Sequence, residues 1–154
     1  MCHNQAILAK AQIALDGALR ELERLAAETA RFCREHSLPS EVEFELTLAL
    51  EELFVNAVRH GGCEGMDNAV RIRLQLTRRG VCVEFCDRGR PFDPAAAPAP
   101  DLAAPLAERL PGGLGIHLVR QIMRDFEYHR EGEWNRLTML LNIRRPIQPE
   151  EPKG

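Results

Sequence analysis

The chain has 154 residues and a net charge of −3, with 45% hydrophobic and 28% charged residues. A chain of this size and composition can bury the core of one domain. The weak negative charge argues against direct nucleic-acid binding. The sequence also lacks an apolar run of the roughly 18 residues that span a bilayer, and it lacks a signal-peptide pattern. We therefore expect a cytoplasmic protein with no membrane association.

The first half of the chain predicts a weak strand and two helices. Residues 6–14 are rich in alanine and fit either a strand or the start of a helix. Asp16 is a candidate N-cap for a first helix, which carries apolar residues at helical spacing. Ser40 and Glu43 have the pattern of a capping box that starts a second helix, and this helix ends before Gly61.

The second half predicts two hairpins with a helix between them. The helix is expected from about Leu114 to Arg124, and turns are expected at Gly80 and Gly132. The predicted strands, most of which alternate with period two, are 70–76, 81–86, 126–130 and 136–143. This order predicts an α+β fold, a two-layer sandwich of a mostly antiparallel sheet with helices on one face.

Residues 1–143 are expected to form a single domain. Within it, the stretch at about 95–111 is rich in alanine and proline and has no strong period, as is typical of a functional loop or lid. Residues 144–154 contain three prolines and predict a disordered tail.

The five cysteines contain no C-x-x-C pair. We expect them to be thiols that pack as small apolar residues, as in a cytosolic protein. A redox or zinc role is the alternative. Geometry disfavours a disulfide between two cysteines that lie four residues apart on one predicted strand. The cysteines are Cys2, Cys33, Cys63, Cys82 and Cys86.

Glu52 and Asn56 stand one helical turn apart in an otherwise apolar segment of the second predicted helix. An amide oxygen suits Mg²⁺, which prefers hard oxygen ligands together with water and phosphate oxygens. A carboxylate one turn away can orient or deprotonate an attacking hydroxyl. A polar surface stripe is the alternative interpretation, but two polar groups near a buried face need partners.

Asp87 ends the first predicted hairpin and precedes Gly89. A buried carboxylate can accept a hydrogen bond from the exocyclic amine of adenine, and guanine has no donor at that position. Gly89 would let the backbone or a water approach the ring. Phe92 either closes the base pocket or belongs to the core. On spacing alone, a common Asp-x-Gly turn is the simpler interpretation.

The segment Gly112-Gly113-Leu114-Gly115 opens the third predicted helix. Unobstructed amides and the positive end of a helix suit a phosphate group, although a hinge is the alternative. The chain contains neither a P-loop nor a strand-borne Rossmann glycine motif. The three segments in this order indicate an ATP site.

Together, residues 51–56, 87–94 and 112–116 resemble the N, G1 and G2 boxes of the GHKL ATPases, which have the Bergerat, or histidine-kinase-like, fold. The form Asp-x-Gly-x-Pro-Phe-Asp-Pro is similar to the anti-sigma factor serine/threonine-protein kinases. The resemblance covers about residues 16–143.

The resemblance implies ATP and Mg²⁺ as cofactors. It makes Glu52 the general base, Asn56 the Mg²⁺ ligand and Asp87 the residue that reads adenine. It places Thr138 where relatives direct a strand residue toward the adenine. The ATP-binding residues that it implies, besides Asn56 and Asp87, are His60, Gly89, Phe92, Gly112, Gly113, Leu114, Gly115 and Thr138.

The resemblance further implies a homodimeric kinase that phosphorylates a serine of an anti-anti-sigma (STAS-domain) partner and that binds a sigma factor in many relatives. One alternative is a nucleotide-responsive module that sequesters a sigma factor or another regulator with little kinase activity. A weaker alternative is a detached ATPase domain of a phosphorelay. The intact Glu52 favours a kinase, because a pure binder needs no base.

Overall fold

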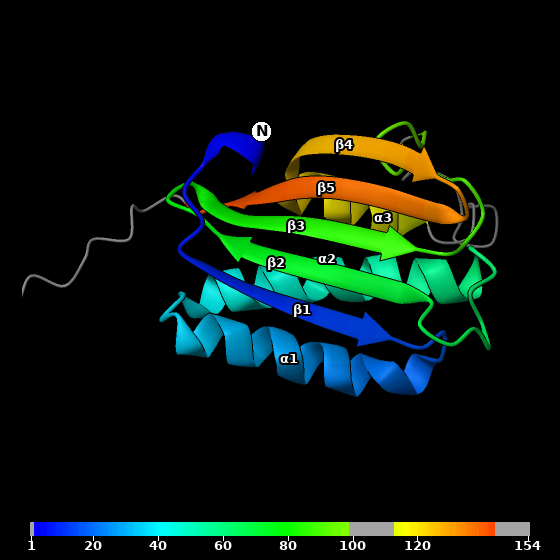
Figure 1. Ribbon diagram of the computed structural model, residues 1–154, viewed down its shortest axis with the longest axis horizontal. Coiled ribbons are helices and arrows are strands. Elements are labelled where there is room, and N and C mark those ends of the chain that lie inside the picture. Colours follow the sequence, from blue (N-terminus) through cyan, green and yellow to red (C-terminus); the bar gives the residue numbers. More distant parts are fainter. Residues whose placement is uncertain (1, 99–112, 144–154) are drawn as a thin grey trace, which may run out of the picture.

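A five-stranded antiparallel sheet with the strand order β1-β2-β3-β5-β4 forms one layer of the molecule. The computed structural model describes residues 2–98 and 113–143. Figure 1 shows that the helices all lie on one side of the sheet. The helices are α1 (Leu22–Glu35), α2 (Ser40–Arg59) and α3 (Gly113–Ile122). The strands are β1 (Ala9–Leu15), β2 (Val70–Leu76), β3 (Gly80–Asp87), β4 (Arg124–Glu131) and β5 (Trp134–Asn142). The predicted α+β sandwich is therefore confirmed.

The period-two pattern decides which side of the sheet meets the helices. On β2, buried Ile72 and Leu74 alternate with exposed Arg71 and Arg73. Ile72 pairs with Phe85 on β3, so that the apolar rows of adjacent strands continue one another. The apolar face of the sheet packs against the helices, and the opposite face carries no α-helix in the described part of the chain.

Helix α2 is the central helix of the second layer and contacts both α1 and α3. Its side chains Leu46, Leu50 and Phe54 are fully buried, at 0% exposure. Because α2 has neighbours on both sides as well as the sheet beneath it, it buries a wide apolar face rather than a narrow stripe. The polar residues Glu52 and Asn56, in the second half of α2, are half-buried at the edge of this packed layer.

The predicted N-cap role of Asp16 is wrong. The first helical segment starts with a 3-10 turn, η2 (Leu19–Glu21), and continues as α1. The Asp16 carboxylate instead accepts a hydrogen bond from the amide of Asn68 at 2.8 Å. Its own amide donates to the carboxylate of Glu21 at 3.1 Å. A partner 52 residues away cannot be seen in a local sequence pattern.

The predicted capping box at Ser40 does not form. Pro39 is the N-cap of α2, and no side chain caps this end. The amide of Glu43 donates to the carbonyl of Pro39 at 3.1 Å. The Glu43 carboxylate pairs with Arg34 of α1 at 3.4 Å. The interhelical ion pair thus takes the side chain that the local pattern assigned to the cap.

The cysteine prediction is wrong for two of the five residues, because Cys2 and Cys82 form a disulfide. The chain before β1 folds back over the sheet, which the sequence does not indicate. Cys33, Cys63 and Cys86 are free. Burial raises the pKa of these three thiols to about 11, so that they remain protonated at neutral pH and act as small apolar residues.

Two predicted segments lie largely outside the described residues. Of the predicted lid at about 95–111, only residues 95–98 are described, and the predicted tail at 144–154 lies wholly outside. The Arg120 guanidinium of α3 donates to the carbonyl of Ala97 at 2.6 Å, which connects the start of this segment to α3. Among the described residues, no helix has the length and apolar character to cross a membrane.

Replacing Leu50 by Ala should lower the free energy of unfolding by about 2–5 kcal/mol, because it leaves a cavity between α2 and the sheet. Phe44→Ala on the same helix is the matched control. Phe44 is 69% exposed, and its loss should change stability by no more than about 0.5 kcal/mol. Urea denaturation measures both values, and equal losses would contradict this packing.

Candidate functional site

Helix α2 carries three predicted site residues on successive turns. Glu52, Asn56 and His60 are each separated by about 6 Å along the helix axis. Glu52 and Asn56 are half-buried, whereas His60 is exposed and ends the helix. The backbone carbonyl of Asn56 accepts hydrogen bonds from the amides of His60 and Gly61, both at 2.9 Å. This closing turn leads the chain directly into the predicted site.

The start of α3 meets α2 at Glu52. A Cβ on Gly115 would overlap the Glu52 carboxylate, so only glycine fits here unless Glu52 moves. Ile116 and Val119 on the next turn are buried and fix α3 in place. The N box and the G2 box, which lie about 60 residues apart in the sequence, are therefore in contact. The contact brings a carboxylate beside the N-terminal turn of a helix, where anions are stabilised.

The G1 loop meets the other end of the same helix segment. The amide of Arg90 donates to the carbonyl of Gly61 at 2.9 Å. Gly89 is buried, and a Cβ there would lie 2.8 Å from both Asp87 Oδ1 and the Gly61 carbonyl oxygen. Any larger residue at position 89 must displace backbone. Asn56 thus lies along α2 between the two places where glycine allows close approach.

Asp87 is the last residue of β3 and lies in phase with the helix-facing side chains of that strand. Its Oδ1 accepts hydrogen bonds from the amide of Gly89 at 2.9 Å and from Nδ2 of Asn135 at 3.0 Å. Burial raises the pKa of Asp87, while these two hydrogen bonds and the charge of Arg130 act in the opposite direction. A carboxylate can accept more than two hydrogen bonds, so acceptor capacity remains.

Asn135 is a residue of the candidate site that the sequence analysis does not predict. It lies on β5 and is 4% exposed. Besides its bond to Asp87, its Nδ2 donates to the carbonyl of Arg90 at 2.7 Å. Its Oδ1 accepts from the hydroxyl of Tyr128 at 2.5 Å and from the amide of Phe92 at 3.4 Å. One buried amide therefore fixes Asp87 and the G1 loop together.

The predicted placement of Thr138 at the adenine site is wrong. Thr138 pairs with Glu84 of β3 and Glu127 of β4, on the face of the sheet without helices. Residues on one strand alternate between faces, so Asn135 and Thr138, three residues apart, point to opposite sides. The signal was present in the sequence, because Asn135 is in phase with the buried core residue Leu137 and Thr138 is not.

The remaining predicted residues lie around this region or outside the described chain. Phe92 is 40% exposed and Leu114 is 39% exposed, so Phe92 does not belong to the core. Gly113 is the first residue of α3. Gly112 lies outside the described residues.

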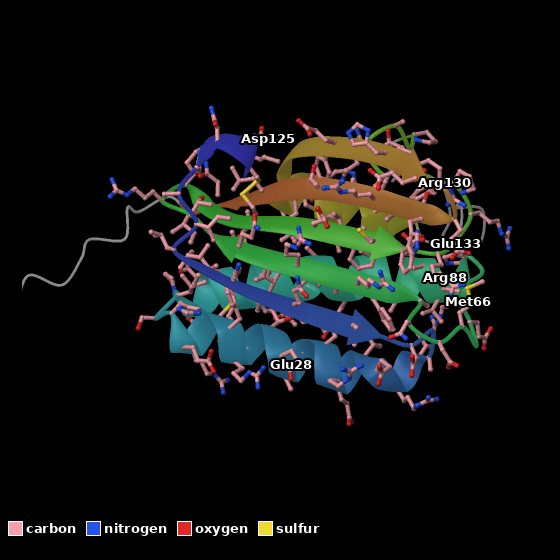
Figure 2. The ribbon with its side chains drawn as sticks, viewed as in Figure 1. Glu28, Met66, Arg88, Asp125, Arg130 and Glu133 are labelled. Carbon is pink, nitrogen blue, oxygen red and sulfur yellow. A yellow bond between two sulfur atoms is a disulfide. The ribbon has the colours of Figure 1, made fainter. Side chains whose placement is uncertain are left out.

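Cationic side chains also occur at this end of the sheet. Arg130 donates to the carbonyl of Gly89 at 2.6 Å and so holds the G1 loop from β4. Arg88 pairs with Glu133 at 3.4 Å. Figure 2 shows Arg88, Arg130 and Glu133 together at the end of the sheet where β3 ends. The loop is thus held by β4 and β5 as well as by α2.

An antiparallel sheet packed on a central helix, with a glycine at a close contact near each end of the site, is the arrangement of a histidine kinase-like ATPase domain. Residues 15–141 match the family of that description, and the chain belongs to this family. The family that the three boxes indicate is therefore confirmed.

The chain is 38% identical over 98 residues to the serine/threonine-protein kinase BtrW of Bordetella bronchiseptica. That alignment covers 64% of this chain and 69% of BtrW. Among solved structures, the RsbU and RsbW domains of Rv1364c from Mycobacterium tuberculosis have a similar fold, with a TM-score of 0.64 and 15% identity. The match covers 90% of this chain but 33% of that larger chain, and it bears on the fold alone.

Asp87→Asn should raise the midpoint of thermal unfolding at pH 7 by roughly 2–4 °C. The raised pKa of Asp87 means that the folded protein binds this proton more tightly than the unfolded chain, so the ionised carboxylate opposes folding at neutral pH. Asparagine keeps an oxygen that accepts both hydrogen bonds and removes the charge. Scanning calorimetry should also show the difference from wild type shrinking as the pH falls through the raised pKa. A lower midpoint for the variant at pH 7 would contradict this account.

Asn135→Ala should lower the free energy of unfolding by about 1–3 kcal/mol, because it leaves the Arg90 carbonyl without its buried donor. The amides of residues 88–93 should exchange with deuterium faster than in wild type. Thr138→Ala is the control on the opposite face, and it should change stability by no more than about 0.5 kcal/mol and leave this exchange unchanged. Unchanged exchange at residues 88–93 in Asn135→Ala would contradict the role of Asn135 in holding the G1 loop.

Proposed function

We propose that this domain binds Mg·ATP and transfers the γ-phosphoryl group to a serine of an anti-anti-sigma (STAS-domain) partner. The observation that supports the proposal most is the contact between Glu52 and Gly115, which sets a carboxylate beside the N-terminal turn of α3. A base is thereby held next to a helix end that suits phosphate. The similarity to a protein named as a serine/threonine-protein kinase supports the same reaction class.

The adenine end of the proposed site is Asp87. Its hydrogen bonds to Gly89 and Asn135 fix the carboxylate, and its remaining acceptor capacity suits the exocyclic amine of adenine. Guanine presents a carbonyl oxygen at the corresponding position and would face the carboxylate with an acceptor. The buried position strengthens this discrimination, because an unpaired acceptor is costly away from water.

The phosphate end of the proposed site lies at the start of α3, beside Glu52, which lies one helical turn from Asn56. Among the described residues no group of three or more His, Cys, Asp or Glu side chains could hold a metal ion by itself. We propose the Asn56 amide oxygen as one protein ligand of a Mg²⁺ ion that is otherwise bound by phosphate oxygens and water. When bound, Mg²⁺ would neutralise negative charge on the phosphates.

Glu52 is the proposed base for the acceptor serine. The carboxylate accepts the hydroxyl proton as the hydroxyl oxygen attacks the γ-phosphorus in line with the leaving oxygen. Phosphoryl transfer depends mostly on positioning and charge stabilisation, so the close approach of Glu52 to α3 matters as much as the carboxylate itself. This reasoning gives Gly115 a steric role, because a side chain there would push the base aside.

Glu52→Gln should reduce phosphoryl transfer by about 10²–10⁴-fold and leave the ATP dissociation constant within about threefold. The assay mixes the full chain with γ-labelled ATP and, in turn, with each purified STAS-domain protein of the same organism. It scores acid-stable phosphoserine on the STAS protein. Glu51→Gln is the matched control, which removes the neighbouring carboxylate and should retain transfer.

Transfer by Glu52→Gln at the wild-type rate would remove Glu52 from the base role. ATP binding without phosphorylation of any STAS protein would contradict the kinase assignment and favour a sequestering module. An acid-labile product would favour a phosphorelay.

A further inference from the structure

The helix-free face of the sheet is covered at one end by the segment 2–8. This segment contains the 3-10 turn η1 (Cys2–Asn4) and then runs into β1. Figure 1 shows it in dark blue, rising across the ends of β3 and β5 on the side away from the helices. The amide of Leu8 donates to the carbonyl of Leu76 at 2.7 Å, so the end of the segment next to β1 extends the pairing of β1 with β2.

The far end of the segment is held by a covalent bond. Cys2 is bonded to Cys82 on the central strand β3, 80 residues further along the chain. The disulfide is the yellow bond beside the N-terminal turn in Figure 2. Cys2 Sγ also lies 4.0 Å from the carbonyl oxygen of Met139, so the segment reaches over β5. The segment therefore reaches from the edge strand β1 to β3 and β5.

Apolar side chains are buried under this segment although no helix covers them. Cys82 is 5% exposed, and its partner across the sheet, Leu140 of β5, is 2% exposed. Farther along the same face Arg71 is exposed, and Arg73, Glu84 and Arg136 line the same cavity as Gln5. The segment 2–8 thus lies over an apolar patch that is bordered by charged side chains.

Polar contacts of the segment are incomplete. Gln5 Oε1 is buried and has no hydrogen-bond partner within the described part of the chain. Leaving such an acceptor unsatisfied costs free energy on docking. A cavity of about 210 Å³ lies between the segment and the sheet and is lined by Gln5, Ile7 and Thr138 among others. Imperfect packing and an unpaired acceptor leave the disulfide as the strongest attachment of the segment.

We propose that Cys2–Cys82 is a redox modification site, and that its bond locks residues 2–8 over the apolar patch formed by Cys82 and Leu140. The co-reactant is a dithiol reductant, and the reverse reaction takes a low-molecular-weight disulfide. This proposal concerns the face opposite to Asp87, and it does not depend on the proposed kinase activity.

Reduction of the Cys2–Cys82 disulfide by the dithiol proceeds in two steps. A thiolate of the dithiol attacks Sγ of Cys2, which is the more exposed of the two residues. A new bond to Cys2 forms, the bond between Cys2 and Cys82 breaks, and Cys82 leaves as a thiolate that takes up a proton. The second thiol of the dithiol then attacks the mixed disulfide, releases Cys2 as a thiol and leaves the reductant oxidised by two electrons.

The bond is tested first by counting thiols. The full chain is equilibrated with glutathione disulfide or with dithiothreitol, unfolded in guanidinium and alkylated with iodoacetamide. Mass spectrometry should find three labels after oxidation, on Cys33, Cys63 and Cys86, and five after reduction. Five labels after oxidation would overturn the proposal.

The attachment of segment 2–8 to the sheet is tested next by hydrogen–deuterium exchange of residues 3–8. In Cys2→Ser, and in reduced wild type, these amides should exchange at least about tenfold faster than in oxidised wild type. In the folded protein, iodoacetamide should label Cys82 only when the disulfide is broken and segment 2–8 leaves the sheet. Cys86→Ser is the matched control, because Cys86 lies on the same strand and face but forms no disulfide. Equal protection of residues 3–8 in oxidised wild type and Cys2→Ser would overturn the lock.

Discussion

The close approach of two glycines to helix α2 and to the turn that follows it is the constraint on which the rest of the site depends. At one place Gly115 brings the start of α3 against Glu52, and at the other Gly89 brings the G1 loop against Gly61. Both contacts require α2 to be fixed, and its fully buried side chains fix it against the sheet and its neighbouring helices. The core therefore sets the spacing between the two ends of the candidate site, at Gly61 and at Glu52.

The two faces of the sheet differ in composition and in what covers them. The helix-facing side carries the core and ends at Asp87 and Asn135, where buried polar groups satisfy one another and shape the G1 loop. The opposite side is charged, with the ion pair between Arg136 and Glu84 at 2.8 Å, and it is covered at one end by the disulfide-held segment. A change on one face can leave the other intact, because the sheet separates them.

The sequence indicated those features that depend on local periodicity. The strand at Val70–Leu76 and its hairpin partner alternate so regularly that their buried face follows from the pattern, and the glycines of the G1 and G2 boxes mark the close contacts. It could not indicate features that depend on distant partners. Asp16 and Glu43 bind groups elsewhere in the fold instead of capping helices, and Cys2 meets Cys82 only after the chain folds back. Thr138 differs, because the alternation of its strand already places it on the face opposite to Leu137.

Isothermal titration calorimetry of the full chain with ATP and with GTP, each with and without Mg²⁺, would test whether Asp87 reads adenine. We expect Mg²⁺-dependent binding of ATP and binding of GTP weaker by at least about tenfold, which corresponds to the loss of one hydrogen bond to a carboxylate. Equal affinity for the two nucleotides would contradict the role of Asp87. No heat of binding at millimolar ATP would contradict the assignment of these boxes as a nucleotide site.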